Sequence, residues 1–478
     1  MYRLVLYYLT VLLLAALAFS FFGILQDSTV AILFSTTFIL AVCWVTNELC
    51  ARFFKAPTNI ESVYITAFIL ALIIQPVSPT SLALLALPFF ASVVAMVSKY
   101  IFAFRKKHFF NPAALGVVVT ALAFGGYASW WVATPVLLPL VVVGGLLVLR
   151  KIRRLDLFAS FAIVSLVTIT LTTPSSSFFG PAWLTLAHSP FFFFGLVMLT
   201  EPLTTPPTRW GRYIYGAIVG ILFAPALHIG TLGSSPELAL VAGNIFSFAI
   251  SPKGRFTLTL KNIEQKSSNV FEFVFGSDVP ITFKAGQYLE WTLPHAPSDT
   301  RGNRRYFTIA SAPEEKDIRL GLKFYEPSST FKKALRNLPL GETLTATALA
   351  GEFVMPKDTE IKLAFLAGGI GVTPFRSMVE HLHLAKEKRD IALLYSNKTP
   401  EEISYAELFD RAREEIGMKT VYPSLIDRSL IETEIPDFKE RVFYVSGPEV
   451  MVDGMTKILI EMHIPRRQIK RDFFPGLA

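Results

Sequence analysis

The sequence predicts a polytopic α-helical membrane domain followed by two further domains, an antiparallel β-barrel and a parallel α/β domain. The chain of 478 residues is 52% apolar and 17% charged, and its mean hydropathy is +0.48. Its long apolar runs lie in 1–250, whereas 253–357 has short alternating stretches and 360–478 alternates strand and helix patterns. This composition excludes a disordered, fibrous or purely soluble protein.

Ten apolar runs in the first 250 residues are candidates for membrane spans. Several are shorter than the ~20 residues that a straight span needs, so the count is nine or ten. The first run is too long, and too closely followed by others, for a cleaved signal peptide. The runs are 3–24, 29–51, 61–75, 79–98, 112–125, 130–149, 157–173, 189–200, 212–230 and 236–250.

The basic residues predict an orientation for these spans. Residues 1–250 hold 13 basic and 6 acidic side chains, and 251–478 hold the other 32 and 31, so most of the net charge of +8 lies in the membrane half. With ten spans, every Lys and Arg of this half falls on one set of alternating loops. The positive-inside rule then predicts an integral inner (cytoplasmic) membrane protein with both termini and the C-terminal half in the cytoplasm. A nearly neutral C-terminal half also argues against nucleic acid as a partner.

The two cysteines do not indicate a metal or redox centre. Cys43 and Cys50 are seven residues apart in one apolar run, which on a helix separates them by two turns, roughly 10 Å, too far for a disulfide. Two thiols are also too few for a four-cysteine iron–sulfur cluster. We predict no metal site and interpret both as small apolar side chains.

From 251 onward the patterns change to those of two soluble domains. Alternating stretches at Arg255–Leu260 and Val270–Phe275, punctuated by Gly and Pro, favour a small β-barrel over 253–357. Beyond it, strands at 361–367, 391–396 and 442–446 alternate with helices near 374–386, 404–416 and 448–462, which predicts a parallel α/β domain over 360–478.

The segment Arg305-Tyr306-Phe307-Thr308-Ile309-Ala310-Ser311 resembles the Arg-x-Tyr-Ser/Thr signature of the ferredoxin–NADP reductase family. The resemblance implies bound FAD, with Arg305 on the pyrophosphate, the aromatic ring on the isoalloxazine and Thr308 near flavin N5. Phe307 stands where that family has a tyrosine, so stacking is kept and a phenol hydrogen bond is lost. Tyr306 and Ser311 are further cofactor-binding candidates.

Two later segments extend this resemblance. Pro327-Ser-Ser-Thr-Phe-Lys-Lys-Ala-Leu resembles the family's phosphate loop, and it implies that Ser329 and Thr330 hold the flavin diphosphate. Phe365-Leu-Ala-Gly-Gly-Ile-Gly-Val-Thr-Pro is a buried strand, a glycine loop and a helix start, the arrangement in which a dinucleotide approaches the backbone closely. The nicotinamide-binding candidates of this loop are Gly368, Gly369, Gly371, Thr373 and Pro374.

The C-terminal segments complete the pattern. Ser396 lies in Tyr395-Ser-Asn, and Ser446, Gly447 and Pro448 lie in Val445-Ser-Gly-Pro. Ser446 stands where the family commonly has a cysteine beside the nicotinamide, and with Thr308 it is our catalytic candidate. Phe474, in the closing segment Asp472-Phe-Phe-Pro-Gly, is expected to pack near the flavin. The resemblance covers about 253–478 and implies NADH or NADPH as substrate.

Two segments of the membrane half, Lys107-His-Phe-Phe-Asn-Pro-Ala-Ala-Leu-Gly and Met198-Leu-Thr-Glu-Pro-Leu-Thr-Thr-Pro, resemble a second family. It comprises the D-type membrane subunit of the Rnf electron-transport complex and the B-type membrane subunit of the sodium-translocating NADH:quinone reductase. That family usually has Thr-Asp-Pro where Glu201 stands here. Its FMN-attachment tetrapeptide Ser-Gly-Ala-Thr is absent from this sequence, so we assign no covalent FMN. A non-covalent flavin and a quinone both remain open for this half.

Two polar residues of these segments have alternative interpretations. An acid at the end of a span is costly unless it is paired or hydrated, so Glu201 is either functional or an interfacial carboxylate paired with Arg209 or Arg212. His108, a lone histidine beside basic residues, is either a ligand or, as we expect, a loop or headgroup contact.

Three functions follow from these patterns. The first is a membrane-bound, flavin-dependent NAD(P)H oxidoreductase that passes electrons through FAD to a quinone, a second flavin or a partner electron carrier. The second is a haem-containing, ferric-reductase-like protein, which three histidines in the membrane half, His108, His188 and His228, limit to one haem. The third is a transport or sensor protein whose reductase module is regulatory.

Overall fold

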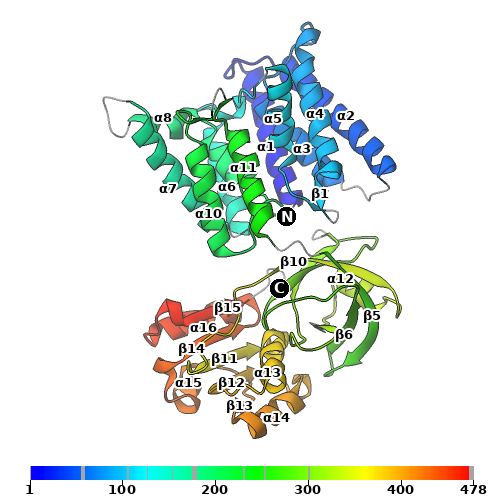
Figure 1. Ribbon diagram of the computed structural model, residues 1–478, viewed down its shortest axis with the longest axis vertical. Coiled ribbons are helices and arrows are strands. Elements are labelled where there is room, and N and C mark those ends of the chain that lie inside the picture. The colour runs from blue at the N-terminus through cyan, green and yellow to red at the C-terminus, as the bar shows by residue number, and fades with distance from the viewer. Residues whose placement is uncertain are drawn as a thin grey trace. The chain divides into compact units, whose positions relative to one another are not determined.

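The computed structural model contains two compact units, Met1–Lys253 and Gly254–Ala478, and each is described by itself (Figure 1). The residues that the structure describes are 2–54, 60–104, 107–125, 127–152, 154–174, 180–229, 232–251, 255–299 and 302–472.

The first unit is a bundle of apolar helices with two short hairpins, β1–β2 (Ala103–Phe104 with Lys107–His108) and β3–β4 (His228–Ile229 with Leu232–Gly233). Its helices, including the π-helical turn η3, are α1 (Tyr2–Phe21), α2 (Thr29–Phe53), α3 (Ile60–Ile73), α4 (Ala86–Ile101), α5 (Pro112–Phe124), α6 (Leu138–Ile152), α7 (Leu155–Thr172), α8 (Gly180–His188), α9 (Phe191–Phe193), η3 (Phe194–Met198), α10 (Arg209–Leu222) and α11 (Pro236–Ile250).

Within the described residues, four helices are long and apolar enough to cross a membrane: Arg3–Phe21, Thr29–Phe53, Ala83–Ile101 and Leu155–Thr172. A fifth candidate is the pair Gly180–His188 and Phe191–Met198, which is bent by 71° at its break. The helices α3, α5 and α11 are apolar but have only 13 to 15 residues, short of a straight span. The count of ten spans therefore stays a prediction.

The sequence predicted a single span over 189–200. In the structure this segment forms α9 and η3, which follow α8 after a bend. Pro190 lies at the break between the two helices, and its ring and missing N–H prevent a helix from continuing straight through it. Both free cysteines lie on α2, where Cys43 is buried and Cys50 is partly exposed.

The second unit begins with a six-stranded antiparallel sheet in the order β8-β7-β10-β5-β6-β9. Its strands are β5 (Arg255–Gln265), β6 (Val270–Ser277), β7 (Tyr288–Thr292), β8 (Arg304–Thr308), β9 (Ile318–Lys323) and β10 (Thr343–Ala350). Phe256, Leu258 and Leu260 alternate along β5 and are buried, because successive strand residues point to opposite faces. They share a core with Phe331 and Leu335 of α12 (Thr330–Arg336).

A five-stranded parallel sheet follows, in the order β13-β12-β11-β14-β15. Its strands are β11 (Leu363–Gly368), β12 (Ile391–Ser396), β13 (Lys419–Val421), β14 (Val442–Ser446) and β15 (Ile469–Asp472), and its helices are α13 (Thr373–Ala385), α14 (Ala406–Ile416), α15 (Arg428–Glu434) and α16 (Glu449–Glu461). These elements confirm the predicted fold class, an antiparallel sheet followed by a parallel α/β layer.

Strand β11 is buried on both faces, which explains its continuous apolar sequence. Phe365 packs in the core that α13 and α14 form on one face. Leu366 packs in the core that α15 and α16 form on the other. The central strand of the sheet is thereby held rigidly, and its carboxyl end is a fixed platform for the loop that follows.

Candidate functional site

The predicted nucleotide-binding residues meet at the carboxyl edge of the parallel sheet. In register, Gly368 at the end of β11 lies beside Ser396 of β12, and Ala367 lies beside Ser446 of β14. Open α/β sheets bind ligands at the carboxyl ends of their strands. The sheet therefore brings Gly368, Ser396 and Ser446 together, although they are far apart in the sequence.

The glycine loop after β11 approaches a second loop very closely. A Cβ atom on Gly371 would lie 2.5 Å from both Cα and N of Gly447 and 2.5 Å from the Ser446 carbonyl oxygen. Gly369 has a positive φ of 52°, which glycine adopts at no steric cost. The two loops thus form a tight backbone cradle at which a dinucleotide can approach, and Pro448 directly precedes α16.

Helix α13 begins where the sequence predicted, at Thr373 with Pro374 in its first turn. The Thr373 hydroxyl donates to the Ile370 carbonyl at 3.2 Å and closes the turn from loop to helix. Proline is favoured at this place because its missing N–H would have no partner inside the helix.

On the antiparallel sheet, Arg305 and Phe307 of β8 share one face with α12. The Phe307 and Phe331 ring centroids are 5.8 Å apart, and the Arg305 guanidinium lies 5.3 Å over the Phe331 ring. Tyr306 points to the other face, where its ring lies 5.8 Å from that of Tyr288 and is 46% exposed. The structure therefore separates Tyr306 from the other members of the motif.

Asp299 joins Arg305 to the predicted phosphate loop. Nη2 of Arg305 donates to both carboxylate oxygens of Asp299, at 2.9 and 3.0 Å. The backbone N–H of Asp299 donates to the Thr330 hydroxyl at 3.0 Å, and His295 Nε2 lies 3.0 Å from the same hydroxyl. Ser329 caps α12 through its hydroxyl, which accepts from the Lys332 N–H at 3.4 Å. The Arg305 guanidinium and the Ser329 and Thr330 hydroxyls are groups that can donate to the diphosphate of FAD, whereas the Asp299 carboxylate competes with it for Arg305.

Sequence reasoning missed His295 and Asp299. Neither belongs to the quoted motifs, and only the fold of the segment after β7 brings them to Thr330. Ser311 is completely buried, and its carbonyl accepts from the Ser377 hydroxyl of α13 at 2.6 Å. It therefore ties the segment after β8 to α13 of the parallel α/β sheet. Phe474 lies outside the described residues.

Asp472, at the end of β15, is a third candidate that the sequence reasoning passed over in favour of Phe474. It lies beside Ser446 in the sheet, and the Thr308 hydroxyl donates to its Oδ2 at 3.5 Å. Burial raises the pKa of the Asp472 carboxyl to about 7, which the Thr308 hydrogen bond only partly offsets. Thr308, Ser446 and Asp472 therefore lie close together where the two sheets meet, and a carboxyl with a strongly shifted pKa is a candidate functional group.

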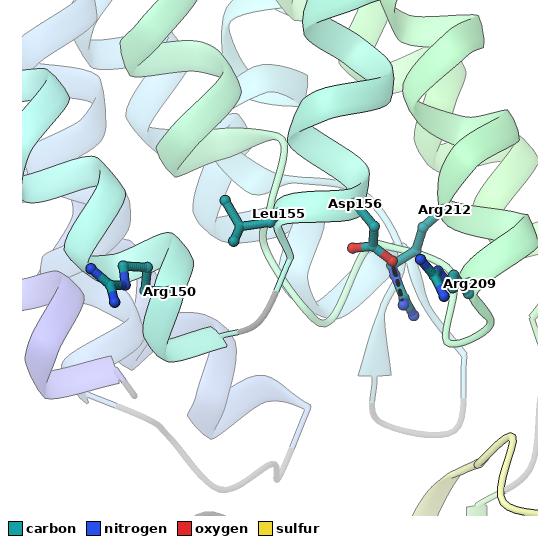
Figure 2. Close-up of a pocket in the computed structure, with 5 residues that line it drawn as sticks. All are labelled: Arg150, Leu155, Asp156, Arg209 and Arg212. Atoms are coloured by element: carbon teal, nitrogen blue, oxygen red, sulfur yellow. Dashed lines mark hydrogen bonds and ion pairs between the residues drawn. The ribbon is translucent and has the colours of Figure 1, made fainter. Parts of the chain in front are cut away.

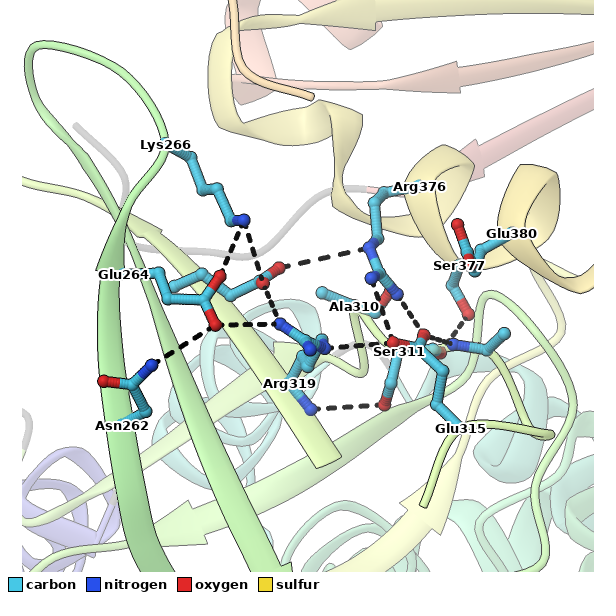
Figure 3. Close-up of polar contacts among 12 residues, drawn as sticks. Asn262, Glu264, Lys266, Ala310, Ser311, Glu315, Arg319, Arg376, Ser377 and Glu380 are labelled. Carbon is cyan, nitrogen blue, oxygen red and sulfur yellow. Dashed lines mark hydrogen bonds and ion pairs between the residues drawn. The ribbon is translucent and has the colours of Figure 1, made fainter. Parts of the chain in front are cut away.

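A buried ionic network joins the antiparallel sheet to α13 (Figure 3). Arg376 of α13 donates to the Ala310 carbonyl at 2.9 Å and forms an ion pair with Glu315. Glu272 of β6 is completely buried, 2.7 Å from Arg319 Nη1 and 4.0 Å from Arg376 Nε. The helix that follows the glycine loop is thus attached to the residues that follow the flavin motif.

Replacing Arg376 with alanine is expected to destabilise the C-terminal unit by about 3 kcal/mol, because Glu315 and Glu272 lose a buried cation. This loss corresponds to a decrease of roughly 6–12 °C in Tm, measured by thermal denaturation of the intact protein. The matched control is Arg411→Ala, which removes an exposed ion pair with Glu380 worth less than about 1 kcal/mol. Equal effects of the two variants would contradict the assigned role of the network.

In the membrane half, the two quoted segments meet at Glu201. Asn111 Nδ2 donates to Glu201 Oε2 at 2.9 Å, and His108 Nε2 lies 3.4 Å from Glu201 Oε1. Asn244 of α11, completely buried, accepts from the Asn111 backbone N–H at 2.7 Å and donates to the Tyr215 hydroxyl at 2.9 Å. The carboxylate therefore lies in a polar cluster built from three distant parts of the chain.

The alternative that paired Glu201 with Arg212 is wrong. Arg212 donates from Nε and Nη2 to Asp156 Oδ2, at 2.8 and 2.5 Å, and Arg209 donates from Nε to the Tyr213 hydroxyl at 2.9 Å. Asp156, the second residue of α7, pairs with Arg212 (Figure 2). The expectation that His108 is a plain loop or headgroup contact also misses its proximity to Glu201. Within the described residues, no group of three or more His, Cys, Asp or Glu side chains could hold a metal ion.

The second unit joins an antiparallel sheet to a parallel α/β sheet, and it follows a unit with several helices long and apolar enough to cross a membrane. Residues 365–457 match the oxidoreductase NAD-binding domain family. Residues 134–252 match the NQR2, RnfD, RnfE family. These matches confirm both resemblances predicted from the sequence.

Among similar curated proteins, a flavohemoprotein from Candida albicans is 27% identical over 208 residues, which are 40% of this chain and 50% of that protein. The F-type subunit of the Na(+)-translocating NADH-quinone reductase from Methylococcus capsulatus is 27% identical over 201 residues, 36% of this chain and 49% of that protein. The chain thus spans about half the length of these relatives. Among solved structures, the FAD/NAD-binding domain of nitric oxide dioxygenase from Vibrio cholerae has a TM-score of 0.41 and 19% identity, and the match covers 45% of this chain and 97% of that one.

Proposed function

We propose that this protein is a membrane-bound, flavin-dependent NAD(P)H oxidoreductase that passes electrons from NAD(P)H through FAD to an acceptor at or in the membrane. The observation that carries the proposal is the convergence of the Gly371–Gly447 loop contact with Ser446, Thr308 and Asp472 at the edge of the parallel sheet. A redox module of this kind fused to an NQR2, RnfD, RnfE-type domain favours a quinone, a second flavin or a redox partner as acceptor.

Each side of the module has a separate task in this proposal. The bound flavin supplies the chemistry that accepts hydride and releases single electrons. Arg305 and Thr330 hold its diphosphate, and Phe307 packs against its ring system. The glycine loops let the dinucleotide approach, and Arg376 keeps α13 against the flavin-binding segment. The Thr308 hydroxyl and the Asp472 carboxyl form a short path that can hold a proton near neutral pH.

The orientation of the membrane half belongs to the same proposal. We place the basic loops, both termini and the reductase module in the cytoplasm, where nicotinamide nucleotides are available. Arg3 pairs with Glu61 at 2.7 Å, and Lys99 donates to the neighbouring Ser62 carbonyl at 2.9 Å. These contacts bring basic residues of two separate segments to the beginning of α3 and support a common side for them.

The test is anaerobic reduction of the purified protein with NADH and with NADPH, followed by absorption spectroscopy. We expect a flavin band that the preferred nucleotide bleaches, and turnover with one of quinone, ferric chelate or soluble carriers offered as acceptor. A Soret band would favour the haem-containing alternative. Absence of both flavin and nucleotide oxidation would favour a transport or sensor protein and would refute the proposal.

The rate of nucleotide-dependent flavin reduction is expected to fall as pH rises through about 7. Below that pH Asp472 holds its proton, and above it an ionised carboxylate next to Thr308 opposes electron delivery to the flavin. Asp472→Asn should remove this transition from the pH–rate profile, and Asp453→Asn, an exposed acid on α16, should leave it. Because the raised pKa means that the folded protein keeps a proton which the unfolded chain loses near pH 3.8, stability should also fall as pH rises from about 4 towards 7.

A further inference from the structure

The segment 400–405 leads from strand β12 to helix α14 and contacts the antiparallel sheet. Glu402 is held there by both of its carboxylate oxygens. Lys323 Nζ, at the end of β9, donates to Oε2 at 2.8 Å, and Asn269 Nδ2, from the turn between β5 and β6, donates to Oε1 at 3.0 Å. Hydrogen bonds to ionised groups are stronger than neutral ones. Glu402 is therefore a firm attachment between the parallel α/β part and the antiparallel sheet.

Ser404 extends this attachment in two directions. Its hydroxyl donates to the Ser267 hydroxyl of the β5–β6 turn at 3.2 Å. Its backbone N–H donates to the Tyr395 hydroxyl of β12 at 3.3 Å, and Ser404 itself is completely buried. The segment 400–405 therefore joins the antiparallel sheet to the strand whose carboxyl end holds one of the nucleotide-binding candidates.

Gly321 is the point on β9 at which two residues of the α/β part approach the antiparallel sheet. A Cβ atom on Gly321 would lie 2.6 Å from the Tyr405 hydroxyl and 2.8 Å from Cγ2 of Thr373. Thr373 begins α13 directly after the glycine loop. Two residues before Gly321, the Arg319 carbonyl accepts from the Ala310 N–H at 2.9 Å. Strand β9 therefore contacts both the start of α13 and the segment that follows the flavin motif.

Tyr405 and Glu272 carry two buried oxygen atoms, the phenol oxygen and Oε1, that make no hydrogen bond within the described residues. Glu272 lies opposite Gly321 in the β6–β9 register, and side chains of directly opposite residues share one face of a sheet. The Tyr405 hydroxyl over Gly321 is thus next to the Glu272 carboxylate. Burial and this carboxylate raise the pKa of Tyr405 well above its usual value, so a protonated donor stands beside an acceptor.

The backbone of Tyr405 is held in an uncommon conformation. Its φ of 64° and ψ of 24° lie in the left-handed region, which residues other than glycine rarely adopt. Such a conformation persists where the surrounding structure enforces it. Buried donors and acceptors rarely stay unpaired, and hydrogen bonds needed for a reaction often tighten only when the substrate is bound. A small shift of Tyr405 towards β6 would pair its hydroxyl with Glu272.

We propose that Tyr405 is a positioning residue for hydride transfer and that its hydroxyl donates to Glu272 Oε1 when the nucleotide binds. This inference rests on the proposed function. The bond draws the segment 400–405 onto β9 and sets the distance between the loops that hold the nucleotide and the sheet that holds the flavin. Reaction rates depend steeply on that distance, since misplacement by about 1 Å can cost about 100-fold.

The test compares Tyr405→Phe, which removes only the hydroxyl, with the wild type by stopped-flow reduction of the bound flavin at increasing NADH or NADPH. We expect the limiting rate to fall about tenfold, as for the loss of one hydrogen bond to a charged group. The nucleotide concentration that gives half the limiting rate, the flavin content and Tm should stay unchanged. Gly321→Ala should also lower the limiting rate, because its Cβ would displace Tyr405 and Thr373 from β9.

Hydrogen exchange with the oxidised nucleotide is a second readout, and it requires no turnover. The Ser268 N–H donates to the Glu401 carbonyl at 3.3 Å, so its exchange reports on the attachment of the segment 400–405. Nucleotide binding should protect this amide and those of residues 401–405 in the wild type, and should protect them less in Tyr405→Phe.

Tyr422→Phe is the matched control. The Tyr422 hydroxyl is also buried and makes no hydrogen bond within the described residues, but Tyr422 follows β13 and packs against Tyr395, with ring centroids 6.1 Å apart. It should leave both readouts unchanged, and an equal loss in this variant would overturn the inference. Normal rate and protection in Tyr405→Phe would overturn the inference and leave the proposed function intact. Absence of nucleotide-dependent reduction in the wild type would refute the proposed function and the inference with it.

Discussion

Protein with Arg305 replaced by alanine is expected to purify without flavin. Arg305 is the best-placed cation for the diphosphate of FAD, since it shares a sheet face with Phe307 and is joined through Asp299 to Thr330. Hydrogen bonds to charged groups contribute about 1.5–3 kcal/mol each. Losing two of them should weaken flavin binding at least about 100-fold, and flavin content per chain and NAD(P)H oxidation should fall together.

Arg304→Ala is the control for this prediction. Arg304 is the preceding residue of β8, but it is exposed and contacts Glu290 at 3.4 Å on the opposite side of the strand. It should keep its flavin. Arg305→Lys separates charge from geometry, because lysine keeps the cation and loses the planar fork, and we expect intermediate flavin retention. Full flavin content and activity in Arg305→Ala would show that the assignment is wrong.

Replacing Gly371 with alanine is expected to abolish reduction by nucleotide while leaving the flavin bound. The added Cβ would lie 2.5 Å from backbone atoms of Gly447 and Ser446, and backbone cannot rotate away as a flexible side chain can. The two loops must separate, and misplacement of a reacting group by about 1 Å can cost about 100-fold in rate. Stopped-flow mixing with NADH or NADPH measures this loss directly.

Dithionite provides the internal control for that experiment, because it should still bleach the flavin of Gly371→Ala at the wild-type extent. Gly454→Ala is the matched variant: Gly454 lies within α16 with no atom within 4 Å of its would-be Cβ. It should react normally and gain up to about 1 kcal/mol in stability, as alanine favours helix. Wild-type reduction of Gly371→Ala by nucleotide would contradict the role of the loop contact.

The C-terminal half could be predicted closely because its signals are local. A continuous apolar run predicts the buried strand β11, and Thr373-Pro374 predicts the start of α13. The helices of the membrane half were harder to predict. An apolar run indicates that a segment prefers lipid to water, but it does not show where a helix begins or ends. The run over 189–200 became a short helix and a π-helical turn after a sharp bend, and α8 was not expected at all.

The residues of the candidate site also fall into two groups, those that the sequence predicted and those that it did not. Arg305, Gly371 and Ser446 were found from motifs. Asp299, which contacts Arg305, lies outside every quoted motif, and Asp472, which contacts Thr308, lies in the closing segment but was not singled out. No local signal marks Asp472, because its strand reads Ile469-Lys470-Arg471-Asp472 and is not apolar. Its contact with Thr308 could not be predicted, because the spacing of residues along the chain does not reveal the order of strands in a sheet.

The amino-acid patterns alone were enough to predict a membrane half, a half with an antiparallel and a parallel sheet, and the residue types of a flavin and nucleotide site. They were enough because hydropathy, strand alternation and glycine loops depend on neighbours along the chain. Which distant groups contact one another became visible only in the folded chain. It placed Asn111 on Glu201, Asp472 on Thr308 and Arg376 on Ala310. Those contacts depend on strand order and helix packing, which many sequences with the same local pattern could satisfy differently.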